Sequence, residues 1–325
     1  MAHRIRVHQH GGPEVLRYEA YDPGSPGPGE VLVRHEAVGL NFIDVYHRTG
    51  LYATGPTPFT PGLEGAGVVE AVGEGVTDLV PGQRVAYAGP PLGAYADLRV
   101  MPADKLVPLP DGIPTDTAAA MMLKGMTVQY LLRQTYRAKP GDTVLFHAAA
   151  GGVGLIFGQW AKHLGVTAIG TVGSPEKAEL AKAHGYAHVI NYKEEDFVAR
   201  VKEITDGKGV PVVYDGVGKA VFMPSLDCLA PCGLAVNFGN ASGPVENLNL
   251  LTLSQKGSLF VTRPTLMTYT RTRELLLACA KDLFEVVMNG AVKIEINQRF
   301  PLKEAEAAHR ALEARETTGS TLLIP

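Results

Sequence analysis

The sequence has few cysteines, few charged residues and no long apolar run. Its 325 residues contain three cysteines, and this small, odd number fits the reducing cytosol better than a disulfide framework. Charged residues make up 19% of the chain and the formal net charge is −3, so neither a nucleic acid nor an anionic membrane is expected as the main partner. No segment reaches the length of a membrane span, and the first six residues lack the apolar stretch of a signal peptide. We therefore predict a cytoplasmic protein without a membrane partner.

The first hundred or so residues and the rest of the chain differ in pattern. Early on, Pro/Gly turns separate short β-rich runs, which is typical of an all-β domain; the runs are residues 4–8, 30–39, 67–72, 84–88, 94–100 and 105–109. From about residue 116 the pattern becomes helical, and it then alternates strand with helix, with strand candidates at residues 144–146, 168–172, 188–190, 212–214 and 235–238. Such alternation predicts a parallel sheet with helices on both faces. A helix at 272–289, a strand near 295–300, a helix at 302–314 and a strand at 321–324 complete the chain.

A glycine-rich turn after the strand at 144–146 is the sharpest signal in the sequence. A short apolar run ends in small residues and leads straight into an amphipathic helix. Small residues let the backbone approach a pyrophosphate closely, and the helix N-terminus offers free N–H groups and the positive end of a dipole. The turn keeps the spacing of the motif G-x-G-x-x-G but has an alanine, Ala149, at the position of the first glycine. The turn predicts a dinucleotide site formed by Ala149, Gly151, Gly152, Val153 and Gly154.

The next strand ends without the acidic residue that binds the ribose of NAD. Gly173, Ser174, Pro175 and Lys177 follow it instead, and the pair Ser174-Pro175 also suits a plain helix start. The missing carboxylate removes the repulsion that would exclude a 2′-phosphate, and Lys177 places a cation one turn into the helix. We therefore predict NADPH as the cofactor, bound in part by Gly173, Ser174 and Lys177.

The turn and its surroundings resemble a known signature. Gly141-Asp142, Leu145, residues 149–152, Gly154, Gln159 and Lys162 are similar to the signature of NADPH:quinone oxidoreductases and ζ-crystallins, in the zinc-free branch of the medium-chain dehydrogenase/reductase superfamily. The resemblance extends along nearly the whole chain, through segments 39–46, 51–52, 61–67, 237–240, 255–258 and 319–325. It implies an α/β protein with a GroES-like, β-rich catalytic domain plus a Rossmann doubly wound parallel sheet. The implied boundaries are 1–123 for the first part of the catalytic domain, 124–262 for the NADPH-binding domain and 263–325 for the C-terminal return.

Zinc-binding members of that superfamily provide a test for a metal. Where they carry Cys, His and a third ligand, this chain has Asn41, Leu63 and Lys124. Glu64 alone cannot hold zinc, because zinc sites need three or four nitrogen, sulfur or oxygen ligands. We therefore predict no metal.

Without a Lewis acid, the reaction should suit an acceptor that takes hydride without metal help, such as a quinone or an α,β-unsaturated carbonyl compound. The resemblance implies reduction by NADPH bound in the cleft between the two domains. It places Asn41 near the nicotinamide ribose, and Tyr46 and Tyr52 at the acceptor, where each hydroxyl would bind a quinone oxygen or relay a proton. Alternatively, both tyrosines have only a packing role, in an aromatic-rich loop, and take no part in the chemistry. The sequence does not distinguish transfer of one electron from transfer of two.

Further cofactor contacts follow from the positions of residues in the expected fold. Gly125 and Thr127 are expected to open the helix that enters the nucleotide-binding domain, and Phe238 and Gly239 end its last long strand. Relatives place an aromatic residue at Tyr192 and basic residues near Arg263 and Arg315; a strand-end tyrosine and a solvated helix end are the alternatives for Tyr192 and Arg315.

Relatives also form homodimers by joining the edges of their Rossmann sheets, and the apolar, β-rich segment 248–261 would be that edge here.

The alternatives to a quinone reductase are an NADPH-dependent enone or 2-alkenal double-bond reductase, and a non-catalytic NADPH-binding protein of crystallin or RNA-binding type. The absence of a basic stripe interleaved with aromatic residues argues against RNA.

Overall fold

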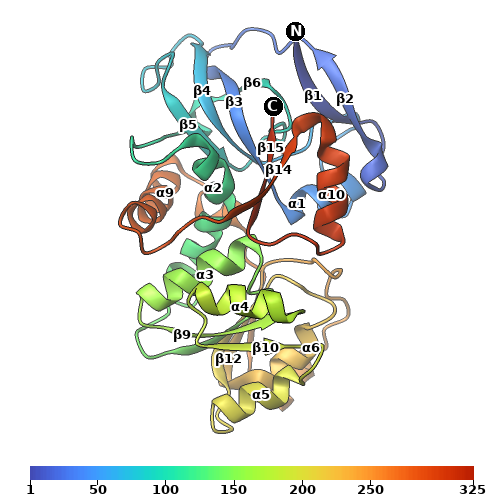
Figure 1. Ribbon diagram of the computed structural model, residues 1–325, viewed down its shortest axis with the longest axis vertical. Helices are drawn as coiled ribbons and strands as arrows, with labels where there is room; N and C mark the ends of the chain where they lie inside the picture. The colour runs from blue at the N-terminus through green and yellow to red at the C-terminus, as the bar shows by residue number, and fades with distance from the viewer. The chain divides into compact units, whose positions relative to one another are not determined.

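The computed structural model describes residues 1–325, which divide into two compact units (Figure 1). The first unit comprises residues 1–126, 270–288 and 294–325, and the second comprises residues 127–269 and 289–293. The boundaries expected from the sequence, after residues 123 and 262, lie close to these divisions and stay predictions. None of the helices is both long enough and apolar enough to cross a membrane.

The first unit is built on a largely antiparallel sheet of seven strands. The strand order is β14-β15-β3-β4-β5-β7, with β6 also paired to β3; only β14 and β15 run parallel. The strands are β3 (Glu30–Leu40), β4 (Glu64–Val72), β5 (Arg84–Ala88), β6 (Leu98–Pro102), β7 (Val107–Pro108), β14 (Ile296–Pro301) and β15 (Ser320–Ile324). A separate antiparallel pair joins β1 (Ala2–Val7) to β2 (Leu16–Tyr21).

Alternation along these strands directs one set of side chains to the core, because successive residues of a strand point to opposite faces. In β3, Val31 and Val33 are fully buried, and Ile5 and Val7 of β1 join the same apolar cluster. The helices of this unit are α1 (Phe42–Thr49), α2 (Thr115–Tyr130, which continues into the second unit), α9 (Arg273–Met288) and α10 (Ala305–Glu313), with 3-10 turns η1 (Pro13–Val15), η2 (Ala103–Lys105) and η5 (Leu302–Glu304).

The second unit holds a parallel sheet of six strands in the order β10-β9-β8-β11-β12-β13. This is the order of a doubly wound dinucleotide-binding sheet, in which the strand order reverses between β8 and β11. The strands are β8 (Thr143–Phe146), β9 (Thr167–Val172), β10 (His188–Asn191), β11 (Val210–Asp215), β12 (Leu229–Asn237) and β13 (Phe260–Thr262).

Helices cover both faces of this parallel sheet. Leu145 packs with Val201 of α5 and Phe222 of α6, whereas its neighbour Phe146 stacks on Phe157 of α3. Because neighbouring residues of a strand face opposite ways, these contacts place α3 and α5 on opposite faces. Figure 1 shows α4 beside β9 and β10. The helices are the π-helical turn η3 (Leu131–Thr135), α3 (Gly152–His163), α4 (Pro175–Ala183), α5 (Phe197–Ile204), α6 (Phe222–Ser225), η4 (Leu226–Cys228), α7 (Leu250–Gln255) and α8 (Leu266–Tyr269).

Four details of the sequence-based prediction were wrong. The segment expected to be an aromatic-rich loop is the helix α1, and Gly125 and Thr127 lie inside α2 and do not open it. The strand expected at 94–100 begins only at 98, because residues 94–97 contact β1 through a single bridge. The segment 248–261 contains the helix α7, and only its end contributes to the edge strand β13.

Candidate functional site

The glycine turn lies between β8 and α3, as predicted. Ala148 adopts a φ of 60°, which turns the chain sharply after the strand, and Gly151 caps the helix in an extended conformation. A Cβ atom at Gly154 would lie 2.5 Å from the carbonyl oxygens of Ala148 and Ala149. Only glycine therefore permits this close approach of helix and strand, which is the packing role that the last glycine of a dinucleotide fingerprint fills.

The N-terminus of α3 presents N–H groups that no capping side chain satisfies. Gly151 has no side chain to accept a bond from the first turn, so the helix begins with donors and the positive end of its dipole uncovered. Ala149 is fully buried, and its Cβ lies against Gly170 of β9, so the alanine at the first glycine position packs the turn on the sheet. These features suit a pyrophosphate, and the turn therefore fits a dinucleotide.

Four residues predicted at the adenosine end come together at the carboxyl ends of β9 and β10. Ser174 caps α4, with its Oγ accepting a hydrogen bond from the backbone N–H of Lys177 at 3.3 Å. Tyr192 follows β10 and donates its backbone N–H to the carbonyl of Val172. A Cβ at Gly173 would lie 2.5 Å from the Tyr192 hydroxyl oxygen, so the phenol lies directly over this glycine. The cluster contains a cation and hydroxyl groups, and the Ser174 hydroxyl also hydrogen-bonds the exposed carboxylate of Glu176.

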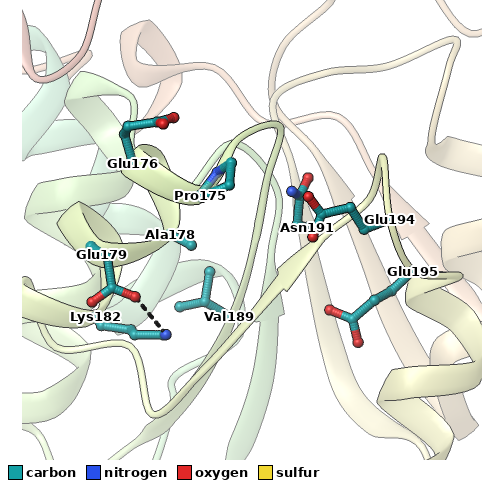
Figure 2. A pocket seen from close by; sticks show the side chains of 9 residues that line it. All are labelled: Pro175, Glu176, Ala178, Glu179, Lys182, Val189, Asn191, Glu194 and Glu195. Atoms are coloured by element: carbon teal, nitrogen blue, oxygen red, sulfur yellow. Dashed lines mark hydrogen bonds and ion pairs between the residues drawn. The ribbon is translucent and has the colours of Figure 1, made fainter.

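Beside this cluster, α4 and the loop after β10 border a hollow of about 450 Å³ (Figure 2). Figure 2 shows side chains of α4 on one side, Val189 between, and Glu194 and Glu195 on the other. The only cation on its lining, Lys182, pairs with Glu179 at 2.8 Å. The remaining charged residues of the lining, Glu176, Glu194 and Glu195, are carboxylates, so the hollow does not suit an anion.

In the first unit, Asn41, Glu64 and Lys124 form a buried hydrogen-bonded cluster. The Asn41 amide Nδ2 donates to Glu64 Oε2 at 2.7 Å, and the Lys124 ammonium lies 3.2 Å from the same oxygen. The backbone N–H of Leu123 donates to the other oxygen of Glu64 at 2.7 Å. Glu64 is 0% exposed and Lys124 5% exposed. Gly39 allows the approach, because a Cβ there would lie 2.2 Å from Glu64 Oε2.

This cluster does not fit zinc. An amide and an ammonium stand at two of the positions compared with zinc ligands, and an ammonium cannot coordinate a cation. Leu63, at the third of those positions, is apolar and buried. No group of three or more His, Cys, Asp or Glu side chains in the structure is arranged to hold a metal ion.

A second buried network lies behind Asn41 and was missed by the sequence analysis. Asp44 accepts the Asn41 backbone N–H and the Tyr95 hydroxyl, both at 2.9 Å, and Tyr95 also contacts His309 at 3.0 Å. Burial raises the pKa of Asp44 to about 7, and burial beside Arg48 lowers the pKa of His309 to about 3. The spacing Asn41-x-x-Asp44 is a helix-start signal that could have revealed α1, whereas no local signal links Asp44 to His309.

Tyr46 and Tyr52 lie together at the end of α1. Their ring centroids are 5.0 Å apart, and the Tyr52 backbone N–H donates to the Tyr46 carbonyl at 3.1 Å. Tyr46 is 7% exposed and Tyr52 is half-buried. His47 lies edge-on to Tyr52, and burial lowers its pKa to about 4. The two tyrosine rings therefore pack together beside His47, whose imidazole is neutral at pH 7.

The remaining predicted residues are spread over both units. Phe238 and Gly239 follow β12, and Arg263 donates to the carbonyl of Asn237 at the end of that strand, at 3.0 Å. Thr127 is buried in α2, and a Cβ at Gly125 would lie 2.4 Å from Leu283, so Gly125 has a packing role. The exposed Arg315 follows α10 with a φ of 62°.

Comparison with known proteins relates these features to described families. Residues 27–111 match the alcohol dehydrogenase GroES-like domain, and residues 152–281 match the zinc-binding dehydrogenase family. The chain is 60% identical to a quinone oxidoreductase of Pseudomonas aeruginosa over 325 residues, all of both proteins. It is 48% identical to a 2-haloacrylate reductase of a Burkholderia species, over 98% of each protein.

The fold is similar to that of solved structures as well. The crystal structure of the Escherichia coli quinone oxidoreductase complexed with NADPH superposes with a TM-score of 0.98 at 52% identity, covering 99% of this chain and 100% of that one.

Proposed function

Because this chain belongs to the quinone oxidoreductase family of the medium-chain dehydrogenases and reductases, we propose that it reduces quinones with NADPH. The proposal rests chiefly on one observation: the chain combines a dinucleotide turn with a buried Asn41–Glu64–Lys124 cluster that has no metal-binding donor set. Hydride reduces a simple ketone or aldehyde readily only when a Lewis acid or a proton donor polarises the carbonyl oxygen, whereas a quinone accepts hydride without a Lewis acid.

The coenzyme would be held by the second unit. N–H groups at the start of α3 would bind the pyrophosphate, and Gly151, Gly152, Val153 and Gly154 would leave room for its close approach. Ser174, Lys177 and Tyr192 would bind the 2′-phosphate, because they bring hydroxyl groups and a cation together. When bound, NADPH supplies the hydride, and the protein contributes orientation and a shielded environment.

Residues of the first unit would bind the electron acceptor. Asn41 is held by Glu64 and by the N-terminus of α1, and its amide would bind the nicotinamide ribose. Tyr46 and Tyr52 would donate hydrogen bonds to the quinone oxygens.

A direct test follows NADPH consumption with 1,4-benzoquinone and with 9,10-phenanthrenequinone. We expect turnover with both quinones and no dependence on added metal. The second candidate is reduction of an activated double bond, which the likeness to the 2-haloacrylate reductase favours. Turnover of 2-chloroacrylate or an enone with inactive quinones would replace the first proposal by the second. Tight NADPH binding without turnover of any acceptor would favour the non-catalytic alternative.

The cofactor preference is tested with Lys177→Ala. Loss of one charge-assisted hydrogen bond should weaken NADPH binding by roughly 1.5–3 kcal/mol and leave NADH binding nearly unchanged. Lys182→Ala is the matched control, because Lys182 lies on the same helix but pairs with Glu179. Ser174→Asp should also disfavour NADPH, through repulsion. Equal weakening of both coenzymes in fluorescence titrations would contradict the assignment of Lys177.

We also infer that the protein forms a homodimer through β13, and that it is located in the cytoplasm. β13 is the edge of the six-stranded sheet, and Phe260 on it is 61% exposed. Leu250 and Leu251 of the neighbouring α7 are 73% and 59% exposed. An apolar edge of this kind is normally covered by a partner. Sedimentation velocity should give a dimer, and Phe260→Lys should shift it toward monomer; a monomeric parent protein would refute the inference.

A further inference from the structure

The first unit contains an arginine-rich hollow that none of the roles above explains. Its volume is about 290 Å³, and it is bordered by Arg4 and Arg6 of β1, Tyr21 at the end of β2, Thr60, and Arg99 of β6. We call it the arginine hollow. All of its lining residues belong to the first unit. One of them, Asp22, is acidic, so the lining carries three positive charges against one negative charge.

Arg99 is a buried charge with only neutral partners. Its side chain is 6% exposed, and its guanidinium donates to the Tyr87 hydroxyl at 3.1 Å and to the carbonyls of Pro91 and Leu92 at 3.0 and 3.1 Å. The backbone of Gly93 lies close to the Arg99 guanidinium, since a Cβ atom added at Gly93 would lie 3.2 Å from Arg99 Nη2. Arginine stays protonated in proteins, and buried charges are normally paired with an opposite charge. Arg99 takes part in none of the chain's ion pairs.

Arg4 and Thr60, which also line the hollow, each have a buried polar atom without a partner. The Arg4 guanidinium carbon lies 4.3 Å from the centroid of the Tyr21 ring, which fixes the cation over the aromatic face. Its Nε atom is buried and has no hydrogen-bond partner, and the same holds for Thr60 Oγ1. Buried polar atoms without a partner are rare in folded proteins, because each costs free energy that a hydrogen bond would recover.

The carboxylates around the hollow are engaged elsewhere. Glu19, opposite Arg4 in the β1–β2 pair, lies 2.5 Å from His8. Asp97 accepts the backbone N–H of His3 at 2.8 Å, and Asp22 accepts that of Gly24 at 2.9 Å. Burial and the charge of Arg4 lower the pKa of Arg6, while Glu19 opposes that change. The arginines therefore repel one another without an internal counter-charge close enough to form an ion pair.

We propose that the arginine hollow binds the dianionic phosphate group of a small molecule. Guanidinium groups bind phosphate oxygens through several parallel hydrogen bonds, and a dianion would neutralise the excess of two positive charges on the lining. The volume exceeds that of one water, ~30 Å³, several-fold, so a phosphate carried by a small organic group also fits. The Tyr21 ring offers such a group an aromatic surface.

Calorimetric titration of the full-length protein with inorganic phosphate and with phenyl phosphate tests the proposal, with sodium chloride at equal ionic strength as the reference. Inorganic phosphate reports the anion alone, and tighter binding of phenyl phosphate would identify an organic phosphate as the preferred source. Titration of Lys177→Ala separates this site from the coenzyme phosphate site, and binding at the hollow should persist in that variant. Binding lost with Lys177→Ala would assign the phosphate to the coenzyme site and overturn the proposal.

Arg6→Gln is the main variant, because Arg6 is only half-buried and its substitution leaves the core intact. It should weaken phosphate binding at least about tenfold. Arg17→Gln is the control: Arg17 lies opposite Arg6 on the same strand pair but is exposed and outside the hollow, so binding should change less than twofold. Equal weakening of phosphate binding by both variants would show a general effect of charge and refute a specific binding site at the hollow.

Thr60→Val gives an independent readout. It removes the unpartnered hydroxyl and keeps the shape of the side chain, so the variant should be at least as thermally stable as the parent without phosphate. With phosphate, its thermal shift should be several-fold smaller than that of the parent. An unchanged phosphate-induced shift in both Thr60→Val and Arg6→Gln would overturn the proposal.

Discussion

Lys124→Met tests whether the buried cluster is held together by charge. Glu64 is fully buried, and its carboxylate relies on the Lys124 ammonium at 3.2 Å, the Asn41 amide at 2.7 Å and the Leu123 N–H at 2.7 Å. Removing one partner of a buried ion pair typically costs about 3–5 kcal/mol, because the other charge stays desolvated. Two neutral hydrogen bonds to Glu64 remain, so we expect a loss of about 3 kcal/mol in the free energy of unfolding.

A double-variant cycle isolates the pair. Glu64→Gln should also destabilise the protein, because it leaves the buried ammonium without its carboxylate. The double variant Glu64→Gln/Lys124→Met carries neither charge, and its cost should fall about 2–3 kcal/mol below the sum of the two single costs. Lys105→Met removes an exposed lysine, paired with Asp104, from the same unit and should cost less than about 0.5 kcal/mol.

Urea unfolding followed by far-ultraviolet circular dichroism measures these costs. The fluorescence of Trp160, the only tryptophan, reports on the second unit and serves as an internal reference. A loss below about 1 kcal/mol for Lys124→Met, or single costs that simply add in the double variant, would refute the reasoning.

Four further outcomes are expected. Gly154→Ala should weaken NADPH binding at least about tenfold in titrations, because the new Cβ would lie 2.5 Å from two carbonyl oxygens of the turn. Asp44 has a pKa of about 7 in the folded protein against 3.8 ordinarily, so its contribution to stability is lost as the pH rises from about 4 to about 7. Asp44→Asn should remove this decline, by up to about 4 kcal/mol in unfolding measured across that range, and an identical pH profile in both proteins would exclude it. Tyr52→Phe should keep NADPH affinity but change turnover or acceptor preference; full activity of both Tyr52→Phe and Tyr46→Phe on every acceptor would make the tyrosines packing residues. Dialysis against a strong chelator should alter neither activity nor stability, and stoichiometric zinc lost together with activity would contradict that expectation.

The strands and the nucleotide turn could be predicted from the sequence because their signals are local. The apolar run of β8, the small residues after it and the amphipathic α3 are contiguous, so periodicity and turn chemistry suffice. The helix α1 was missed because its aromatic residues suggested a loop, although Asn41 and Asp44 mark a helix start. Likewise, segment 248–261 has the composition of a strand, but Asn249 caps a helix there.

The buried clusters of the first unit could not have been read from the sequence. Glu64 and Lys124 are sixty positions apart, and the Tyr95–His309 contact spans 214. Each residue alone is an ordinary polar side chain, and only the folded sheet brings such distant positions together. The pKa values follow from burial, which a composition pattern does not report.

The strand pairing of the first unit's sheet affects the order in which the two units fold during synthesis. Strand β3 pairs with β15, so that Leu40 lies opposite Thr321, four residues from the end of the chain. The second unit, by contrast, is almost complete once residue 269 has been made. Since domains fold as units while the chain emerges from the ribosome, the nucleotide-binding half acquires its structure first. The β-rich half waits with an open edge on β3 until residues 320–324 have been made, and during that interval it is the part of the nascent protein most in need of a chaperone.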